Sequence, residues 1–214
     1  MQLDTAHVKD ALMRLRAAQP QVFGADSHHF QLNPSLPGED VVRFEREHGV
    51  ELPSDYRQFI TSVGNGGAGP FYGIFPLGKM DDNFDLRTWQ EDDGFIGVLS
   101  SPFSLANHWN ELTGMPADDL VDQDEAEYEA QMDAFDKSYW RSSLMNGAIP
   151  ICHEGCALRV WLVVSGPESG KIWEDRRSGY AGITRMTLAD GSPATFASWY
   201  GEWLNSCLAK CGKR

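Results

Sequence analysis

The chain has 214 residues, a length that fits one large domain or two small ones. Hydrophobic residues make up 42% of it and charged residues 23%, which is typical of a folded protein and excludes wholesale disorder. The longest uninterrupted run of aliphatic or aromatic residues is 160–164. A membrane-spanning helix needs about 20 such residues, so none is predicted.

The net charge is strongly negative and is concentrated in the middle of the chain. Asp and Glu number 31 against 18 Lys and Arg, which gives a formal charge of −13. Residues 118–136 hold nine acids and no base, namely Asp118, Asp119, Asp122, Asp124, Glu125, Glu127, Glu129, Asp133 and Asp136. Residues 81–93 hold six acids, Asp81 and Asp82 among them, and one base. Nucleic acids and anionic membranes would be repelled, so a basic protein is the better partner.

The cysteines and the N-terminal residues indicate the cellular compartment in which the protein is expected. Four cysteines, Cys152, Cys156, Cys207 and Cys211, all lie in the last third of the chain. The N-terminal residues follow a helical pattern that includes acids and contain no apolar stretch of the kind found in a secretory signal. We therefore expect a cytoplasmic protein with free thiols.

A first helix is predicted by apolar residues at i, i+3, i+4 and i+7, namely Val8, Ala11, Leu12 and Leu15. We expect Thr5 to cap its N-terminus and Pro20 to lie beyond its end. Residues 19–38 are rich in Pro, Gly, Asn and His and are interpreted as a connection. Within it, His28 and His29 are expected to be exposed and to have no role.

Two more helices are predicted before residue 70. One begins at Pro37 and ends at Gly49 in a left-handed cap, and the next begins at Pro53 and ends at a glycine-rich loop, 64–70. A short strand over 71–75 follows the loop. The residues expected on the buried helical faces are Val41, Phe44 and His48, then Tyr56, Phe59, Ile60 and Val63.

The remainder combines helices with strands. A short helix over 105–112 and a longer one over 121–139 are predicted, and the longer helix carries the acidic cluster with Asp118 and Asp119 in its first turn. Three strands follow at 149–152, 158–165 and 171–174, of which the second is apolar on both faces. The chain closes with a helix over 196–211. No linker is long enough to separate two domains, so residues 1–214 are predicted to form a single α+β domain.

The glycine-rich loop matches the string G-x-G-x-x-G of dinucleotide-binding proteins. In such a site a strand precedes the string and a helix follows it, whereas here a helix precedes it. The loop is therefore interpreted as a tight turn in which glycine supplies positive φ angles. The residues that define this turn are Gly64, Asn65, Gly66, Gly67, Gly69 and Pro70.

Other chemistry-bearing residues have a simpler structural interpretation. Cys152, His153 and Cys156 together with Cys207 and Cys211 could offer zinc ligands, but cysteines at i and i+4 on an apolar helical face are more typical of packing. Cys152 and His153 are neighbours along a strand and point to opposite faces, so they do not form a nucleophile pair. Clustered carboxylates are usually a solvated face, and otherwise a recognition surface. No catalytic residue, metal or cofactor is predicted.

Several motifs are similar to those of the SUKH superfamily, the Smi/Knr-type domain. The first block is LPSDYRQF at 52–59 followed by VGNGGAGPFYGIFPL at 63–77. The second block comprises IPICHEGC at 149–156, WLVVSG at 161–166, GKIWED at 170–175 and FASWYGEWL at 196–204. The resemblance covers about 35–77 and 147–208. Residues 78–146 and the N-terminal helix resemble nothing in the family and are interpreted as this chain's own elaboration.

The resemblance implies an α+β domain with a mostly antiparallel sheet backed by helices, and a role without catalysis. Bacterial members are commonly immunity proteins that neutralise a toxin domain, often a nuclease. Fungal relatives regulate cell-wall assembly, so a regulatory scaffold that binds another protein is the alternative. The family offers no catalytic residues to transfer, and its toxin-contacting surfaces vary among members.

Charge and resemblance together predict where a partner binds. A nuclease must hold a polyanion and tends to be basic around its active site, so clustered carboxylates would mimic phosphates and speed the encounter. Both acidic stretches lie where the family pattern lapses. The predicted partner-binding residues are Asp81, Asp82, Asp118, Asp119, Asp122, Asp124 and Glu125.

Overall fold

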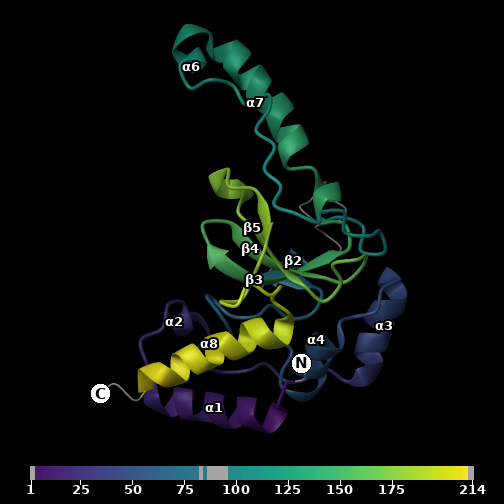
Figure 1. The fold of residues 1–214 in the computed structure, drawn as a ribbon, viewed down its shortest axis with the longest axis vertical. Helices are drawn as coiled ribbons and strands as arrows, with labels where there is room; N and C mark the ends of the chain where they lie inside the picture. The colour runs from purple at the N-terminus through teal and green to yellow at the C-terminus, as the bar shows by residue number, and fades with distance from the viewer. Residues whose placement is uncertain (1–2, 82–83, 86–95, 212–214) are drawn as a thin grey trace.

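An antiparallel sheet of four strands lies at the centre of the fold (Figure 1). The computed structural model describes residues 3–81, 84–85 and 96–211. The strands are β3 (Ala148–Gly155), β4 (Leu158–Val163), β5 (Ile172–Asp175) and β6 (Ile183–Arg185), and each pairs with the next along the chain. The three predicted strands are confirmed as β3, β4 and β5. Strand β6 was not predicted, because three residues are too short to show an alternating pattern.

Helices pack around this sheet and extend beyond it. In the described residues the α-helices are α1 (Thr5–Ala18), α2 (Ala25–His28), α3 (Gly38–His48), α4 (Ser54–Ser62), α6 (Leu120–Gln123), α7 (Glu125–Tyr139) and α8 (Phe196–Cys211). Short 3-10 helices lie at Ser142–Met145 and Arg177–Gly179. A separate two-stranded sheet contains β1 (Lys79–Asp81) and β2 (Phe84–Asp85). This architecture is a single α+β domain, as predicted.

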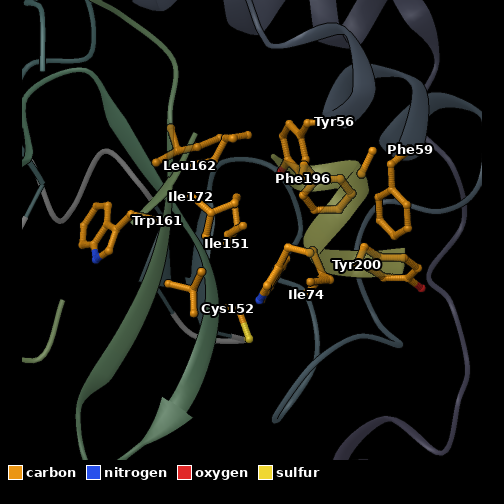
Figure 2. Packing of buried hydrophobic residues seen from close by; sticks show 14 of the residues in the cluster. Tyr56, Phe59, Ile74, Ile151, Cys152, Trp161, Leu162, Ile172, Phe196 and Tyr200 are labelled. Atoms are coloured by element: carbon orange, nitrogen blue, oxygen red, sulfur yellow. The ribbon is translucent and has the colours of Figure 1, made fainter. Parts of the chain in front are cut away.

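The main core lies between one face of the sheet, α4 and α8. Figure 2 shows sheet residues pointing toward helical aromatic rings, namely Ile151, Leu162 and Ile172 toward Tyr56, Phe59, Phe196 and Tyr200. The Phe59 ring lies 5.0 Å from the Phe196 ring and 4.9 Å from the Tyr200 ring. Trp161 points to the opposite side of the sheet (Figure 2), the side on which Trp173 packs against Phe103 at 5.0 Å. The prediction that β4 is covered on both faces is confirmed.

The N-terminus of α8 is held by a residue far away in sequence. The Asp55 carboxylate accepts a hydrogen bond from the Ala197 amide at 2.9 Å and another from the Tyr56 amide at 2.8 Å. Thr195 and Ser198 also cap this end, since each hydroxyl accepts from the other residue's amide. Asp55 thereby joins the first turns of α4 and α8, which pack the core.

Two predicted elements do not form. Residues 71–75 make no strand, because Phe71 (φ +50°) and Gly73 (φ +102°) bend the chain. Among these residues only Ile74 forms isolated β-bridges, with Gly67 and with Cys152. Residues 105–112 make no helix, because Trp109 pairs instead with Ile183 at the edge of the sheet, through hydrogen bonds of 2.9 and 2.8 Å. A sheet edge offers backbone partners that a local periodicity cannot reveal.

Other local expectations also need correction. Asp4, rather than Thr5, caps α1, and its carboxylate accepts from the His7 amide at 3.0 Å. His28 is buried, not exposed: it ends α2 and lies against the rings of Phe30 and Trp203. Its Nδ1 accepts from the Phe30 amide at 3.0 Å, and burial lowers the pKa of the imidazole.

Candidate partner-binding surface

Residues 118–139, which we name the acidic arm, project from the body of the protein (Figure 1). The arm consists of the short helix α6 and the longer helix α7, which pack against each other. In α7 only Phe135 and Tyr139, near its C-terminal end, are buried. The rest of the arm therefore presents its side chains to solvent on several sides.

All nine acids of the stretch 118–136 lie on this arm, and eight of them are exposed, with Asp136 half-buried. Glu125, Glu129 and Asp133 follow each other at i, i+4 and i+8, so they share one face of α7. In the described residues, none of the nine carboxylates forms an ion pair with a basic side chain. The arm is thus a region of uncompensated negative potential.

The arm is not the single helix that the sequence analysis predicted. Asp119 lies at the N-cap position of the short helix α6, without a capping hydrogen bond, and Asp118 precedes it, so neither lies in the first turn of α7. Asp124 has extended backbone (φ −154°) and caps α7, where its carboxylate accepts from the Glu127 amide at 3.1 Å. An Asp followed three residues later by Glu is a capping signal that could have located this break.

One exposed apolar side chain lies among the carboxylates. Val121 on α6 is 42% exposed, and its neighbours in the chain include Asp119 and Asp122. Protein interfaces commonly combine an apolar contact with a charged surround that excludes water. The tip of the arm has both features.

A buried ion pair anchors the base of the arm. The side chain of Arg177 is fully buried and forms two hydrogen bonds with Asp175, from Nε at 2.9 Å and from Nη2 at 2.6 Å. Its Nη1 donates to the carbonyl oxygen of Tyr139, the last residue of α7, at 3.1 Å. The Tyr139 hydroxyl donates to Asn110 at 2.7 Å. These contacts join the C-terminal end of α7 to β5 and to the loop beside β6.

The second acidic stretch is only partly placed. Asp81 lies in β1, which contacts β3 in the body of the protein. Asp82 lies outside the described residues, as do Glu91, Asp92 and Asp93. Of the predicted partner-binding residues, the structure brings together Asp118, Asp119, Asp122, Asp124 and Glu125 on the arm.

The cysteines do not converge. Cys152 and Cys207 are buried, Cys211 is half-buried and Cys156 is exposed. Burial raises the pKa of Cys207 to about 11 and that of Cys152 above its usual range, so both are neutral thiols. Within residues 3–81, 84–85 and 96–211, no group of three or more His, Cys, Asp or Glu side chains is placed to hold a metal ion.

The glycine-rich loop is a close-packed turn. Gly66 and Gly67 have φ angles of +86° and +92°, and Gly67 exchanges two backbone hydrogen bonds with Ile74. A Cβ on Gly67 would lie 2.5 Å from the carbonyl oxygen of Gln31, so no side chain fits there. No helix begins in the described residues directly after the loop, so the loop lacks the helix N-terminus that a dinucleotide site requires.

The family model for the SMI1 / KNR4 family (SUKH-1) matches residues 36–182. The chain belongs to this family. The resemblance that the motifs indicated is therefore confirmed, and membership points to interaction with another protein. The match to SUKH-1 runs through 78–146, which includes the acidic arm, and ends before α8. Its extent thus differs from the two blocks at 35–77 and 147–208.

Searches of curated proteins and of solved structures give no match to this SUKH-1 chain. No helix in the described part of the chain combines the length and apolarity needed to cross a membrane.

Proposed function

We propose that this SUKH-1 protein is a non-enzymatic immunity protein that binds and neutralises a cognate toxin domain in the bacterial cytoplasm. The observation that carries the proposal is the acidic arm, which projects from an anchored base and holds nine carboxylates that form no ion pair with any described basic residue. Family membership supports protein binding, and the arm's charge favours a basic partner.

The chemistry of the partner follows from this charge. A nuclease toxin binds phosphates, so the walls of its cleft carry an excess of Lys and Arg. Carboxylates held on a projecting helix pair can enter such a cleft and occupy the positions of the phosphates. Their long-range potential raises the association rate, and Val121 adds an apolar contact at the tip. Inhibition on this account requires binding alone, with no bond made or broken.

The arrangement of the acids is easier to explain by binding than by folding. Glu125 and Glu129, and then Glu129 and Asp133, are like charges at i and i+4, and each such pair destabilises a helix by about 0.2–0.5 kcal/mol. Glu125 gains from the dipole at the start of α7, but Glu129 and Asp133 lie beyond the first turn. Glu129 therefore gains nothing from the dipole or from a base at i+4, whereas Asp133 lies four residues before Lys137, a spacing that is favourable by about 0.2–0.5 kcal/mol.

The test is to replace Asp118, Asp119, Asp122 and Asp124 with Asn and Glu125 with Gln, and to measure binding to the toxin domain encoded beside this gene. We expect the association rate to fall at least tenfold at low salt and to lose most of its salt dependence. Asn is also a good helix cap, so Asp124→Asn preserves the start of α7. An unchanged association rate and salt dependence would show that the acids do not act as a phosphate mimic.

A matched control removes the same charge elsewhere. Five exposed acids of the body are neutralised together, namely Asp10, Asp26, Glu39, Glu51 and Glu202. An equal loss of association rate in this control would show that net charge acts without a specific surface. Co-expression with the toxin tests the biological role, because an immunity protein restores growth, whereas a regulatory scaffold of the Smi/Knr type does not.

A further inference from the structure

Glu154, near the end of β3, is a buried carboxyl group with few partners. Its side chain is 5% exposed. Within the described part of the chain, Oε1 has no hydrogen-bond partner, and Oε2 lies 3.4 Å from Nη2 of Arg176. A buried carboxylate normally accepts several hydrogen bonds, so this one is poorly compensated when ionised.

The basic neighbour is also shared with a second acid. Arg176 Nε donates to Glu174 Oε2 at 2.9 Å, a shorter contact than the one with Glu154. Burial, which is the largest cause, and repulsion by Glu174 together raise the pKa of Glu154 to about 7 against the opposing effect of Arg176. The thiol of Cys152 on β3 also interacts electrostatically with Glu154. Glu154 therefore holds a proton in the folded protein at pH values where an exposed glutamate has lost it.

The hairpin turn beside Glu154 is strained. Cys156 and Ala157 join β3 to β4, and they and Gly155, the last residue of β3, have positive φ angles of +49°, +61° and +101°. Cys156 and Ala157 are exposed and are not glycines, so their left-handed backbone costs free energy. The pairing register of β3 and β4 also shifts between His153 and Gly155. This end of the hairpin thus combines backbone strain with irregular strand pairing.

Ser178 and Tyr72 contact this end from outside the hairpin. The Ser178 hydroxyl donates to the Cys156 carbonyl at 2.9 Å, and the Tyr72 amide donates to the His153 carbonyl at 3.4 Å. The Tyr72 ring packs over Gly155, where an added Cβ would lie 3.3 Å from it. Tyr72 is uncharged, so the loop over this end offers no compensating charge to Glu154.

We propose that Glu154 is a pH-sensitive latch: its protonated form keeps residues 152–160 closed, and its ionisation releases this end of the hairpin to solvent. In the closed state Glu154 keeps its proton up to about pH 7, and in the open state it loses it near the ordinary value of 4.5. The closed state therefore binds more protons between these two values, and closure is lost as pH rises through that window. Below pH 4.5 and above pH 7 the equilibrium is independent of this group.

Hydrogen exchange measures the latch directly. Protection factors of the amides in the β3–β4 pairs, corrected for intrinsic exchange, are expected to fall at least tenfold from pH 5 to pH 7 in the wild-type chain. In Glu154→Gln they should be independent of pH in this range. Glu168→Gln is the matched control, because both Glu168 oxygens accept from Arg185 at 3.0 Å, and it should behave like the wild type.

A third variant separates the latch from a merely structural role. Glu174→Gln removes the repelling carboxylate and frees Arg176 for Glu154, so the fall in protection should be complete at a lower pH than in the wild type. The proposal would be overturned if the protection factors of the wild type did not change between pH 5 and pH 7. It would also be overturned if they fell by the same factor in Glu154→Gln. If Glu154→Gln does not fold, carboxyl-carbon NMR of the wild type decides: titration of Glu154 near pH 4.5 overturns the latch, and titration near pH 7 supports it.

Discussion

The buried ion pair between Arg177 and Asp175 gives the sharpest test of how the acidic arm is held. Arg177→Met keeps much of the side-chain volume but removes all three hydrogen bonds that the guanidinium forms. The Asp175 carboxylate, 8% exposed, would then be buried without its counter-ion. The Tyr139 carbonyl at the end of α7 would lose its donor as well.

The expected loss follows from that unpaired charge. Breaking one partner of a buried ion pair costs about 3–5 kcal/mol. In a chain of this length each kcal/mol lowers Tm by about 2–4 °C, so Arg177→Met should lower Tm by roughly 10 °C. Urea unfolding followed by circular dichroism gives the free energy of unfolding, and thermal scans give Tm.

A double variant distinguishes charge from packing. In Arg177→Met with Asp175→Asn the unpaired charge is gone, and the amide oxygen can still accept from the residue 177 amide, as Asp175 does at 3.1 Å. We expect it to recover more than half of the stability lost in the single variant. The role of the unpaired charge would be refuted if Arg177→Met lowered the free energy of unfolding by less than about 1 kcal/mol. It would also be refuted if the double variant were no more stable than the single variant.

Two further substitutions test the contacts that position α8 and the glycine-rich loop. Asp55→Ala removes the carboxylate that accepts from the Ala197 amide and should lower the free energy of unfolding by about 1–2 kcal/mol, measured in urea. Gly67→Ala should cost more than about 2 kcal/mol because its Cβ would collide with the Gln31 carbonyl. Gly191→Ala is its control: the φ is similar, +82°, but nothing lies within 4 Å of an added Cβ, so about 1 kcal/mol of strain is expected. Equal losses at positions 67 and 191 would show that the loop is not close-packed.

Periodicity predicted the fold where an element is long and its partners are local. The final helix shows its apolar face over four turns, and it forms as predicted over Phe196–Cys211. Periodicity could not predict elements whose conformation depends on contacts with residues far away in the chain. Trp109 adopts an extended backbone only because Ile183 lies beside it, and Asp55 caps a helix that starts 141 residues later in the chain.

In the candidate surface, too, local features could be predicted from the sequence and features that depend on distant contacts could not. The charge of the arm could be predicted from the sequence, because its nine acids all fall within residues 118–136, which contain no base. The projection of the arm from the body could not be predicted from the sequence. It depends on the anchoring of Tyr139 by Arg177, which lies 38 residues away in the chain. Glu154 gave no signal in the sequence either, because its burial arises from the pairing of three strands.

The acids of α7 allow folding and binding to be separated in one variant. Glu129→Gln with Asp133→Asn removes two exposed carboxylates that accept no hydrogen bond within the described part of the chain. Relief of the like-charge pairs at i and i+4 should raise the free energy of unfolding by up to about 0.5 kcal/mol or leave it unchanged. Binding to the proposed partner, a basic toxin domain, should weaken in the same variant, with the loss mainly in the association rate at low salt. Unchanged or higher stability together with weaker binding is expected only if the carboxylates contribute to the complex and not to folding. A variant that loses stability while its binding is unaffected would assign the acids to the folded chain itself and leave the arm without a role in recognition.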